Sequence, residues 1–287
     1  MYIKKSYLCT IFLRIIMKFI TAIRNRKAVH AYSGEPLSNA HVAKIEEFIR
    51  QMPVPFGAKV RICLLRGNQK DSKTTKLGTY GRCKNTCDFL VAIYKNAPLA
   101  EEAAAYVLEQ MVLFCSNLGL GTCLLVDQFH HENFLKRIQL EPGEILKMIT
   151  PVGYLSQRRR SFGHKVEHAT QSDPHKPFEK LFCNKNFNTP LHEEQAGIYA
   201  EPLEIVRVGL SGIDRQAYCI VLNDNHLHFY KLFSEYAAVD MGIALCHFEQ
   251  SCTELDIKGT YKVMNIKTKN HRYEYVISWI SEQNNTD

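Results

Sequence analysis

The sequence has no long apolar run that could cross a bilayer. Residues 1–16 are basic and then apolar, like the start of a signal peptide, but Arg14 interrupts them and no small-residue cleavage site follows. They are also too short to span a membrane. Met17 begins a stretch that resembles a natural protein start, so we expect residues 1–16 to be an N-terminal extension and expect no membrane partner.

The ten cysteines do not have the spacing of a disulfide framework. Most lie in apolar segments, where cysteines act as small buried hydrophobes in a reducing compartment, so we expect a cytoplasmic protein. We expect no metal site, because Cys83 and Cys87 have no second ligand pair at usable spacing. His226 and His228 fit one face of a hairpin strand better than a pair of metal ligands.

The charge pattern has no nucleic-acid signature. The 36 lysines and arginines exceed the 29 acidic residues and give a net charge of +7, but apart from residues 158–160 the basic residues are scattered. No interleaved aromatics or recognised motif accompany that arginine triplet, which we interpret as an exposed loop. The sequence therefore predicts no nucleic-acid partner.

One stretch, 101–126, organises the rest of the chain. Acidic residues open it at the positive end of a helix dipole, and a wide apolar band predicts a buried central helix. Gly119 supplies a left-handed stop, and the turn Gly119-Leu120-Gly121-Thr122-Cys123 leads into a short strand over 123–126. Taken alone, this turn is a tight connection; its backbone could also meet a flat ligand.

Hydrophobic periodicity predicts the other elements, and a polar, basic stretch over 155–176 is the best domain boundary. The central helix ends Cys-Ser-Asn-Leu-Gly-Leu-Gly-Thr, and a second long helix ends Cys-Thr-Glu-Leu-Asp-Ile-Lys-Gly-Thr. This echo indicates one helix–turn–strand unit used twice, although chance also explains it. We predict halves over 17–160 and 161–287. Helices are expected over 19–26, 39–51, 132–138, 202–208 and 236–255, and strands over 60–64, 88–94, 148–154, 218–222, 227–231, 260–265 and 272–278.

Four segments in this order resemble the nitroreductase family of flavoproteins, in the single-chain TM1586 type with two nitroreductase-like halves. They are Arg26-Lys27-Ala28-Val29-His30-Ala31-Tyr32, Gly119-Leu120-Gly121-Thr122-Cys123, Ser211-Gly212-Ile213-Asp214-Arg215-Gln216-Ala217-Tyr218 and Asp240-Met241-Gly242-Ile243-Ala244-Leu245-Cys246-His247-Phe248. The resemblance implies an α+β fold with a mixed sheet flanked by helices. Ordinary members are homodimers with two FMN sites at the interface. Here the two halves would form a pseudo-dimer, so a monomer would suffice for one FMN site.

The resemblance also implies roles for single residues. Arg26, Lys27, Ala28 and His30, with His175, would surround the FMN phosphate, where fixed positive charge is needed. The ring system would lie against Leu120, Gly121 and Thr122. Ser211, Asp214 and Gln216 would form the opposite wall. Ala28 stands where the family has Ser, His30 where it has Arg or Lys, and Asp214 where it has Asn.

The implied activity is that of an FMN-dependent NAD(P)H oxidoreductase. Hydride would pass from NAD(P)H to flavin N5, and from there to a nitro-aromatic or quinone-like acceptor. The flavin carries this chemistry, so no catalytic side chain is expected. The alternative is a non-catalytic protein of the same fold that binds flavin weakly, or another small ligand in the interdomain cleft.

Overall fold

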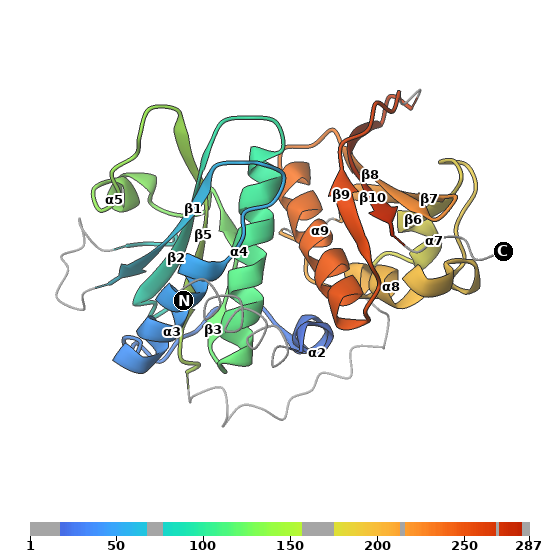
Figure 1. Cartoon of the computed structure of the whole chain (residues 1–287). Coiled ribbons are helices and arrows are strands. Elements are labelled where there is room, and N and C mark those ends of the chain that lie inside the picture. The colour runs from blue at the N-terminus through green and yellow to red at the C-terminus, as the bar shows by residue number, and fades with distance from the viewer. Residues whose placement is uncertain (1–17, 68–76, 157–174, 213–215, 268–269, 283–287) are drawn as a thin grey trace, which may run out of the picture.

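The computed structural model describes residues 18–67, 77–156, 175–212, 216–267 and 270–282. These residues form two lobes, each a β-sheet packed against helices, and one long helix from each lobe lies at the centre (Figure 1). The fold is α+β, as the sequence predicts.

The first lobe contains an antiparallel sheet with the order β1-β2-β5-β3, in which β4 also pairs with β5. Ser38 begins helix α3, because its Oγ accepts a hydrogen bond from the His41 amide at 3.3 Å. Strand β2 is central, and all of its residues except the last are buried. The bounds are α3 Asn39–Gln51, β1 Val60–Arg66, β2 Asp88–Lys95, α4 Ala100–Asn117, β3 Gly121–Thr122, β4 Leu125–Val126, α5 His131–Leu135 and β5 Glu144–Gly153.

The second lobe contains a mixed sheet with the order β6-β7-β8-β10-β9, in which only β6 and β7 run parallel. Asp224 and Asn225 join β7 to β8 with φ values of 45° and 62°, as a tight hairpin requires. The strands expected over 218–222 and 227–231 are confirmed, and they pair as a hairpin. The bounds are α7 Phe178–Leu181, β6 Phe182–Asn184, two short 3-10 helices Glu193–Gln195 and Gly197–Tyr199, α8 Ala200–Val208, β7 Tyr218–Asn223, β8 His226–Leu232, α9 Ala237–Glu254, β9 Gly259–Lys262 and β10 Tyr273–Ser281.

The two lobes share a connectivity. In each lobe, two antiparallel strands that pair with each other are followed by a helix of 18 residues. The last strand of the lobe then pairs with the second strand of that first pair. Thus β1, β2, α4 and β5 correspond to β7, β8, α9 and β10. The two helix–turn–strand segments that resemble each other in sequence occupy equivalent positions in the two lobes.

Helices α4 and α9 lie side by side between the sheets (Figure 1). Their backbones approach closely at Gly242, where an added Cβ would lie 2.2 Å from the Glu102 carbonyl oxygen and 2.7 Å from Ala105 Cβ. Tyr106 also donates a hydrogen bond to Glu249 at 2.5 Å across the same interface. Both helices are buried along most of their length, so one continuous core extends through both lobes.

Helix α2, Phe19–Asn25, crosses from the first part of the chain to the second lobe, and lies below α4 and α9 in Figure 1. The Ile20 amide donates to a carboxylate oxygen of Glu254 at 2.9 Å, and Arg24 forms an ion pair with Glu201 at 2.9 Å. In its contacts α2 therefore belongs largely to the second lobe, although it precedes α3 in sequence.

Several expectations about elements differ from the structure; β5, for example, begins at Glu144 rather than at residue 148. The expected strand over 123–126 is broken, because Cys123 and Leu124 separate β3 from β4. Strand β10 contains a register shift between Tyr275 and Ile277, and residues 276–279 are all buried, so the strand does not alternate between two faces there. Strand β9 ends at Lys262 rather than residue 265. Among the described residues, no helix is both long and apolar enough to cross a membrane.

Candidate functional site

The segment 26–33 lies across the turn that follows α4, so the structure brings two of the predicted site segments together. The Val29 amide donates to the Thr122 carbonyl oxygen at 2.9 Å. On the other side, Tyr32 donates its amide to Lys84 and Lys84 donates its amide to His30, at 3.0 and 2.9 Å. Three stretches that are distant in sequence are thus joined by backbone hydrogen bonds.

The Gly-Leu-Gly turn is buried against that segment. Gly119 has φ 74°, as a left-handed helix stop requires, but Gly121 is extended and belongs to β3. A Cβ at Gly121 would lie 2.9 Å from both methyl groups of Val29. Leu120, Gly121 and Thr122 are all buried, and the Leu120 amide already donates to the Cys115 carbonyl at 3.0 Å. In this structure, Val29 occupies the face where a flat ring was expected.

Arg26 lies in a buried ion pair. Its guanidinium is 3.6 Å from Glu109 Oε1, and the two side chains are 8% and 1% exposed. His247 Nε2, from α9, is 3.0 Å from the same oxygen. Burial alone would raise the pKa of Glu109, but the Arg26 charge and the His247 hydrogen bond outweigh burial and lower it. This cluster joins both lobes, and much of the Arg26 charge is compensated within the protein.

Three buried polar atoms near this interface have no hydrogen-bond partner among the described residues. They are Glu109 Oε2, His247 Nδ1 and Ser211 Oγ. Gly209 packs on His247, because a Cβ added there would lie 2.2 Å from Nδ1. Unpartnered polar atoms in a core are costly, so they mark places that a ligand or water can complete. Glu109 and His247 were missed from the sequence, although each is a polar side chain within an apolar helix.

Exposed basic side chains surround the outer side of the segment 26–33. Lys27 and His30 were predicted, whereas Arg82 and Lys84 were not; all four are exposed, and Ala28 between the first two is half-buried. None of the four side chains forms an ion pair with a carboxylate within the described ranges. Arg82 and Lys84 reach this place through the bridge between Ala31 and Lys84, which local sequence patterns do not reveal.

The second-half segment approaches the turn from the other lobe. A Cβ at Gly212, next to Ser211, would lie 3.7 Å from Leu124. Asp240 holds this loop by accepting the amides of Gly212 and Ala217 at 2.8 and 3.2 Å. Asp214 lies outside the described residues.

Gln216 is committed to the loop itself. Its Oε1 accepts the Lys176 amide at 2.8 Å, and its Nε2 donates to the Arg207 carbonyl at 2.7 Å. Lys176 in turn donates its ammonium to the Gln216 carbonyl at 2.9 Å. His175 precedes this lysine, so it is placed beside the same loop.

A thiol pair lies under His30. Cys83 and Cys123 are buried, and a hydrogen bond with Cys83 lowers the pKa of Cys123 to about 7. Burial acts in the opposite direction, while the charges of His30, Arg26 and Arg82 favour the thiolate. The same hydrogen bond and burial raise the pKa of Cys83.

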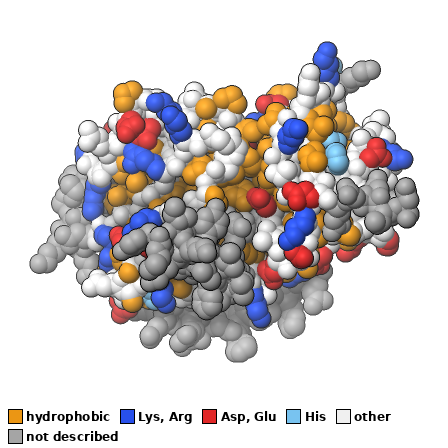
Figure 2. All heavy atoms as spheres, viewed as in Figure 1, with side chains coloured by type: hydrophobic (Ala, Val, Ile, Leu, Met, Phe, Trp, Pro, Cys, Tyr) orange, Lys and Arg blue, Asp and Glu red, His pale blue; other side chains and the backbone are white. Residues whose placement is uncertain are grey.

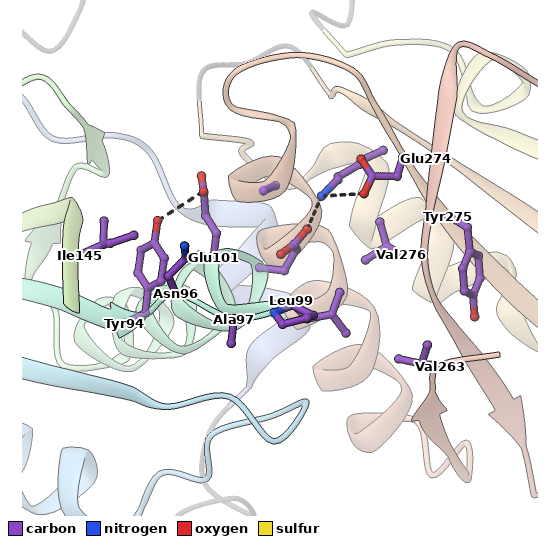
Figure 3. Close-up of a pocket in the computed structure, with 14 residues that line it drawn as sticks. Tyr94, Asn96, Ala97, Leu99, Glu101, Ile145, Val263, Glu274, Tyr275 and Val276 are labelled. Atoms are coloured by element: carbon purple, nitrogen blue, oxygen red, sulfur yellow. Dashed lines mark hydrogen bonds and ion pairs between the residues drawn. The ribbon is translucent and has the colours of Figure 1, made fainter. Parts of the chain in front are cut away.

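A separate pocket of about 510 Å³ opens between the lobes (Figure 3). Its lining includes Leu99, Glu101 and Glu102 at the start of α4, whereas the Gly-Leu-Gly turn follows the end of that helix. In the space-filling view, hydrophobic side chains gather between the two lobes (Figure 2). Lys231 bridges Glu102 and Glu274 at 2.7 and 3.7 Å, and Tyr94 donates to Glu101 at 3.3 Å. The apolar part of the lining comes from Leu99, Ile145, Ala238, Val263 and Val276.

FMN fits the observed arrangement only in part. The exposed cations fit a phosphate, and the unpartnered Ser211 Oγ fits a polar ligand atom. The expected slot does not fit, because Val29 covers Gly121 and Arg26 is paired with Glu109. Binding of a flavin at this turn requires Val29 to move.

Comparisons with known proteins give one family. A family model described as "Putative TM nitroreductase" matches residues 18–252. A solved structure described as a "putative nitroreductase" from Thermotoga maritima MSB8 covers 93% of this chain and 95% of its own, with 17% identity and a TM-score of 0.59. That likeness shows the same fold over nearly the whole chain.

Other solved structures match about half of the chain. An FMN-dependent nitroreductase from Clostridium difficile R20291 covers 47% of this chain and 87% of its own, with 16% identity and a TM-score of 0.39. A nitroreductase with bound FMN from Bacteroides fragilis NCTC 9343 covers 49% and 89%, with 14% identity and a TM-score of 0.39. No curated protein matches the chain.

Proposed function

The chain belongs to the "Putative TM nitroreductase" family, and we propose from this that it is a nitroreductase-type oxidoreductase that uses FMN. The observation that carries the proposal is the convergence of the segments 26–33 and 119–124 beneath a set of exposed cations. When bound, FMN supplies hydride transfer between NAD(P)H and a nitro-aromatic or quinone-like acceptor. One chain supplies one site, so a monomer suffices, and the free cysteines suit a reducing cytoplasm.

The chain's own residues bind and orient the cofactor. Lys27, Arg82 and Lys84 provide positive charge for the phosphate, and His30 adds to it only when protonated. Leu120, Gly121 and Thr122 border the ring once Val29 has moved. Ser211 presents its free hydroxyl from the second lobe. We retain Ala28, His175, Asp214 and Gln216 as proposed neighbours of the cofactor on the family resemblance alone.

An FMN titration followed by the visible spectrum tests this proposal. We expect one flavin per chain, and we expect Lys27→Ala and Arg82→Ala each to weaken binding about tenfold, since a charge-assisted contact contributes about 1.5–3 kcal/mol. Lys44→Ala is the matched control, because Lys44 is an equally exposed lysine on α3. Equal affinities in all four proteins would remove the cations from the site, and calorimetry showing two equal sites would contradict the stoichiometry.

A second candidate function is the binding of a different small molecule in the pocket between the lobes. The pocket volume suits a small ligand. Its lining holds three carboxylates and one lysine, so an uncharged or cationic aromatic molecule suits it better than a phosphate. This function would be non-catalytic.

The two candidates separate in one experiment on the purified chain. A flavin protein takes up FMN and then oxidises NAD(P)H, and a bulky Ala238→Trp substitution in the pocket leaves FMN uptake unchanged. Absence of FMN uptake at high FMN concentration would reject the first candidate and leave the pocket as the site to screen.

A further inference from the structure

His30, Cys83 and Cys123 come from three separate parts of the sequence and meet at one point of the first lobe. One potential ligand atom from each residue lies within 4.8 Å of the other two. Cys123 Sγ lies 3.8 Å from His30 Nδ1. We propose that these three residues bind one transition-metal ion of borderline softness, and that zinc is the ion they match best.

The spacing is close to that of a formed site. Zinc bonds of about 2.3 Å to sulfur and about 2.0–2.1 Å to nitrogen place tetrahedral ligands about 3.5–3.8 Å apart. The observed spacing therefore needs a contraction of at most about 1.3 Å. A turn of the exposed imidazole can supply this without a change in the core.

Hydrogen bonds of backbone amides hold the ligand residues in place. The Lys84 amide donates to the His30 carbonyl at 2.9 Å, which fixes Cys83 beside the segment 26–33. The Cys123 amide donates to Thr150 Oγ1 at 3.0 Å, which anchors Cys123 to β5. Ligands fixed in advance in this way lower the cost of assembling a metal site.

Apart from the hydrogen bond between them, the two thiols have only weak alternatives to a metal. Cys83 Sγ lies 3.9 Å from the Val29 carbonyl oxygen, and Cys123 Sγ lies 4.0 Å from that of Leu124. His30 Nδ1 is 3.2 Å from the Arg82 carbonyl oxygen, a contact that metal binding through Nδ1 would replace. Two thiolates and an imidazole select zinc or copper(I) over magnesium or calcium.

The charge of the site balances on binding. The incoming Zn²⁺ displaces one proton from each thiol into solvent, and two thiolates then neutralise the ion beside Arg82 and Arg26. Three protein ligands leave a fourth position on the exposed side of His30, where a water or another small donor can bind. The inference goes beyond the proposed function: it shares His30 with the proposed phosphate cluster, but neither thiol belongs to the predicted flavin site.

Cobalt(II) titration of the reduced, chelator-treated full chain tests the site, because cobalt gives a sulfur-to-metal charge-transfer band in the near ultraviolet. We expect one equivalent to saturate the band and Zn²⁺ to displace it. Cys83→Ser and Cys123→Ser should abolish the band, and His30→Ala should weaken cobalt binding about tenfold or more. Cys87→Ser is the control, because Cys87 lies four residues from Cys83 and instead contacts the Gly34 carbonyl at 2.9 Å.

The readout needs no flavin, so its failure and that of the proposed function are distinguishable. A wild-type chain without the band, or a band that survives in a folded Cys123→Ser variant, would overturn the proposal. So would a band that is lost in Cys87→Ser. If the serine variants fail to fold, His30→Ala decides, because this exposed side chain can be removed without opening the core; unchanged cobalt affinity would then reject the site.

Discussion

The side chain of Arg26 lies inside the molecule, where it forms an ion pair with Glu109. The same carboxylate also contacts His247 of the other lobe. Breaking a buried pair by removing one partner leaves the other charge desolvated, which is more damaging than never having had the pair. Arg26 therefore supports the fold whether or not a phosphate binds nearby.

We expect Arg26→Ala to lower the free energy of unfolding of the ligand-free protein by about 3 kcal/mol, because it leaves Glu109 buried without its cation. Chemical denaturation measures this directly. Lys27→Ala is the neighbouring control and should unfold like the wild type, since Lys27 is exposed. Equal stability of the two variants would show that the Arg26–Glu109 contact contributes little.

Gly121→Ala should destabilise the protein by about 1–3 kcal/mol through overpacking, because its Cβ meets the Val29 methyl groups. Adding Val29→Ala to the same chain should restore part of the loss. Gly119→Ala is the contrast: no atom lies near its Cβ, but φ is 74°, so its cost of about 1–2 kcal/mol should not respond to Val29→Ala. Thermal melts of the five proteins compare them, and a lack of rescue would mean that Val29 does not close the turn.

At the scale of elements, an ion pair ties β1 to β5 over the intervening strand. Two nitrogens of Arg61 donate to the Glu144 carboxylate at 2.8 and 2.7 Å. These hydrogen bonds lower the pKa of Glu144 from 4.5 to about 2, although burial acts in the opposite direction. A carboxyl with a lowered folded-state pKa stabilises the fold above its unfolded pKa and loses that contribution as pH falls.

We therefore expect Glu144→Gln to cost about 1 kcal/mol at pH 7, with the difference from the wild type vanishing between pH 4.5 and about 2. The value is well below what the pKa shift alone would give, because the Arg61 side chain is 39% exposed and water screens the pair. Stability measured against pH checks this. Glu46→Gln, at an exposed position of α3, should change neither the stability nor its pH slope.

Most elements could be predicted from the sequence because their signals are local. The cap at Ser38, the Asp224–Asn225 hairpin and the apolar periodicity of α4 each depend on residues a few positions apart. The β10 bulge was missed because it depends on pairing with β8. The break between β3 and β4 depends in the same way on pairing with β5.

The candidate site was predictable only in its outline. Sequence motifs identified the segments around Arg26 and Gly121, and the structure places these segments in contact. Sequence motifs could not show that Val29 covers the turn or that Glu109 pairs with Arg26, since these contacts join distant positions. Cys83 and Cys123 were missed as a pair for the same reason. The flavin roles of the predicted residues stay predictions.

At the scale of the whole molecule, the helix pair α4–α9 makes the two lobes one unit. A single hydrophobic core includes Leu108 and Met111 of α4 together with Met241 and Leu245 of α9. Neither lobe can expose its central helix without exposing that of the other, so the lobes should unfold together.

Gly242→Ala tests the packing of α4 against α9, because the added Cβ meets the Glu102 backbone and must push the two helices apart. We expect a loss of about 1–3 kcal/mol in the free energy of unfolding, despite the higher helix propensity of alanine.

Fluorescence of Trp279, the only tryptophan and buried in the second lobe, should follow the same transition as far-ultraviolet circular dichroism of the whole chain. Two separate transitions would show that the lobes are independent.

The crossing of α2 to the second lobe has a consequence during protein synthesis. Its contact partners Glu201 and Glu254 are made long after it, and the Ile20–Glu254 hydrogen bond spans 234 positions. At a synthesis rate of about 5–20 residues per second, on the order of ten seconds or more pass after α2 is made before Glu254, which accepts the Ile20 hydrogen bond, is synthesised. A helix of 7 residues is too short to be stable alone in water over that interval. The early-synthesised helix is therefore among the last to find its place, and until then the apolar face formed by Phe19, Ala22 and Ile23 is available to chaperones on the nascent chain.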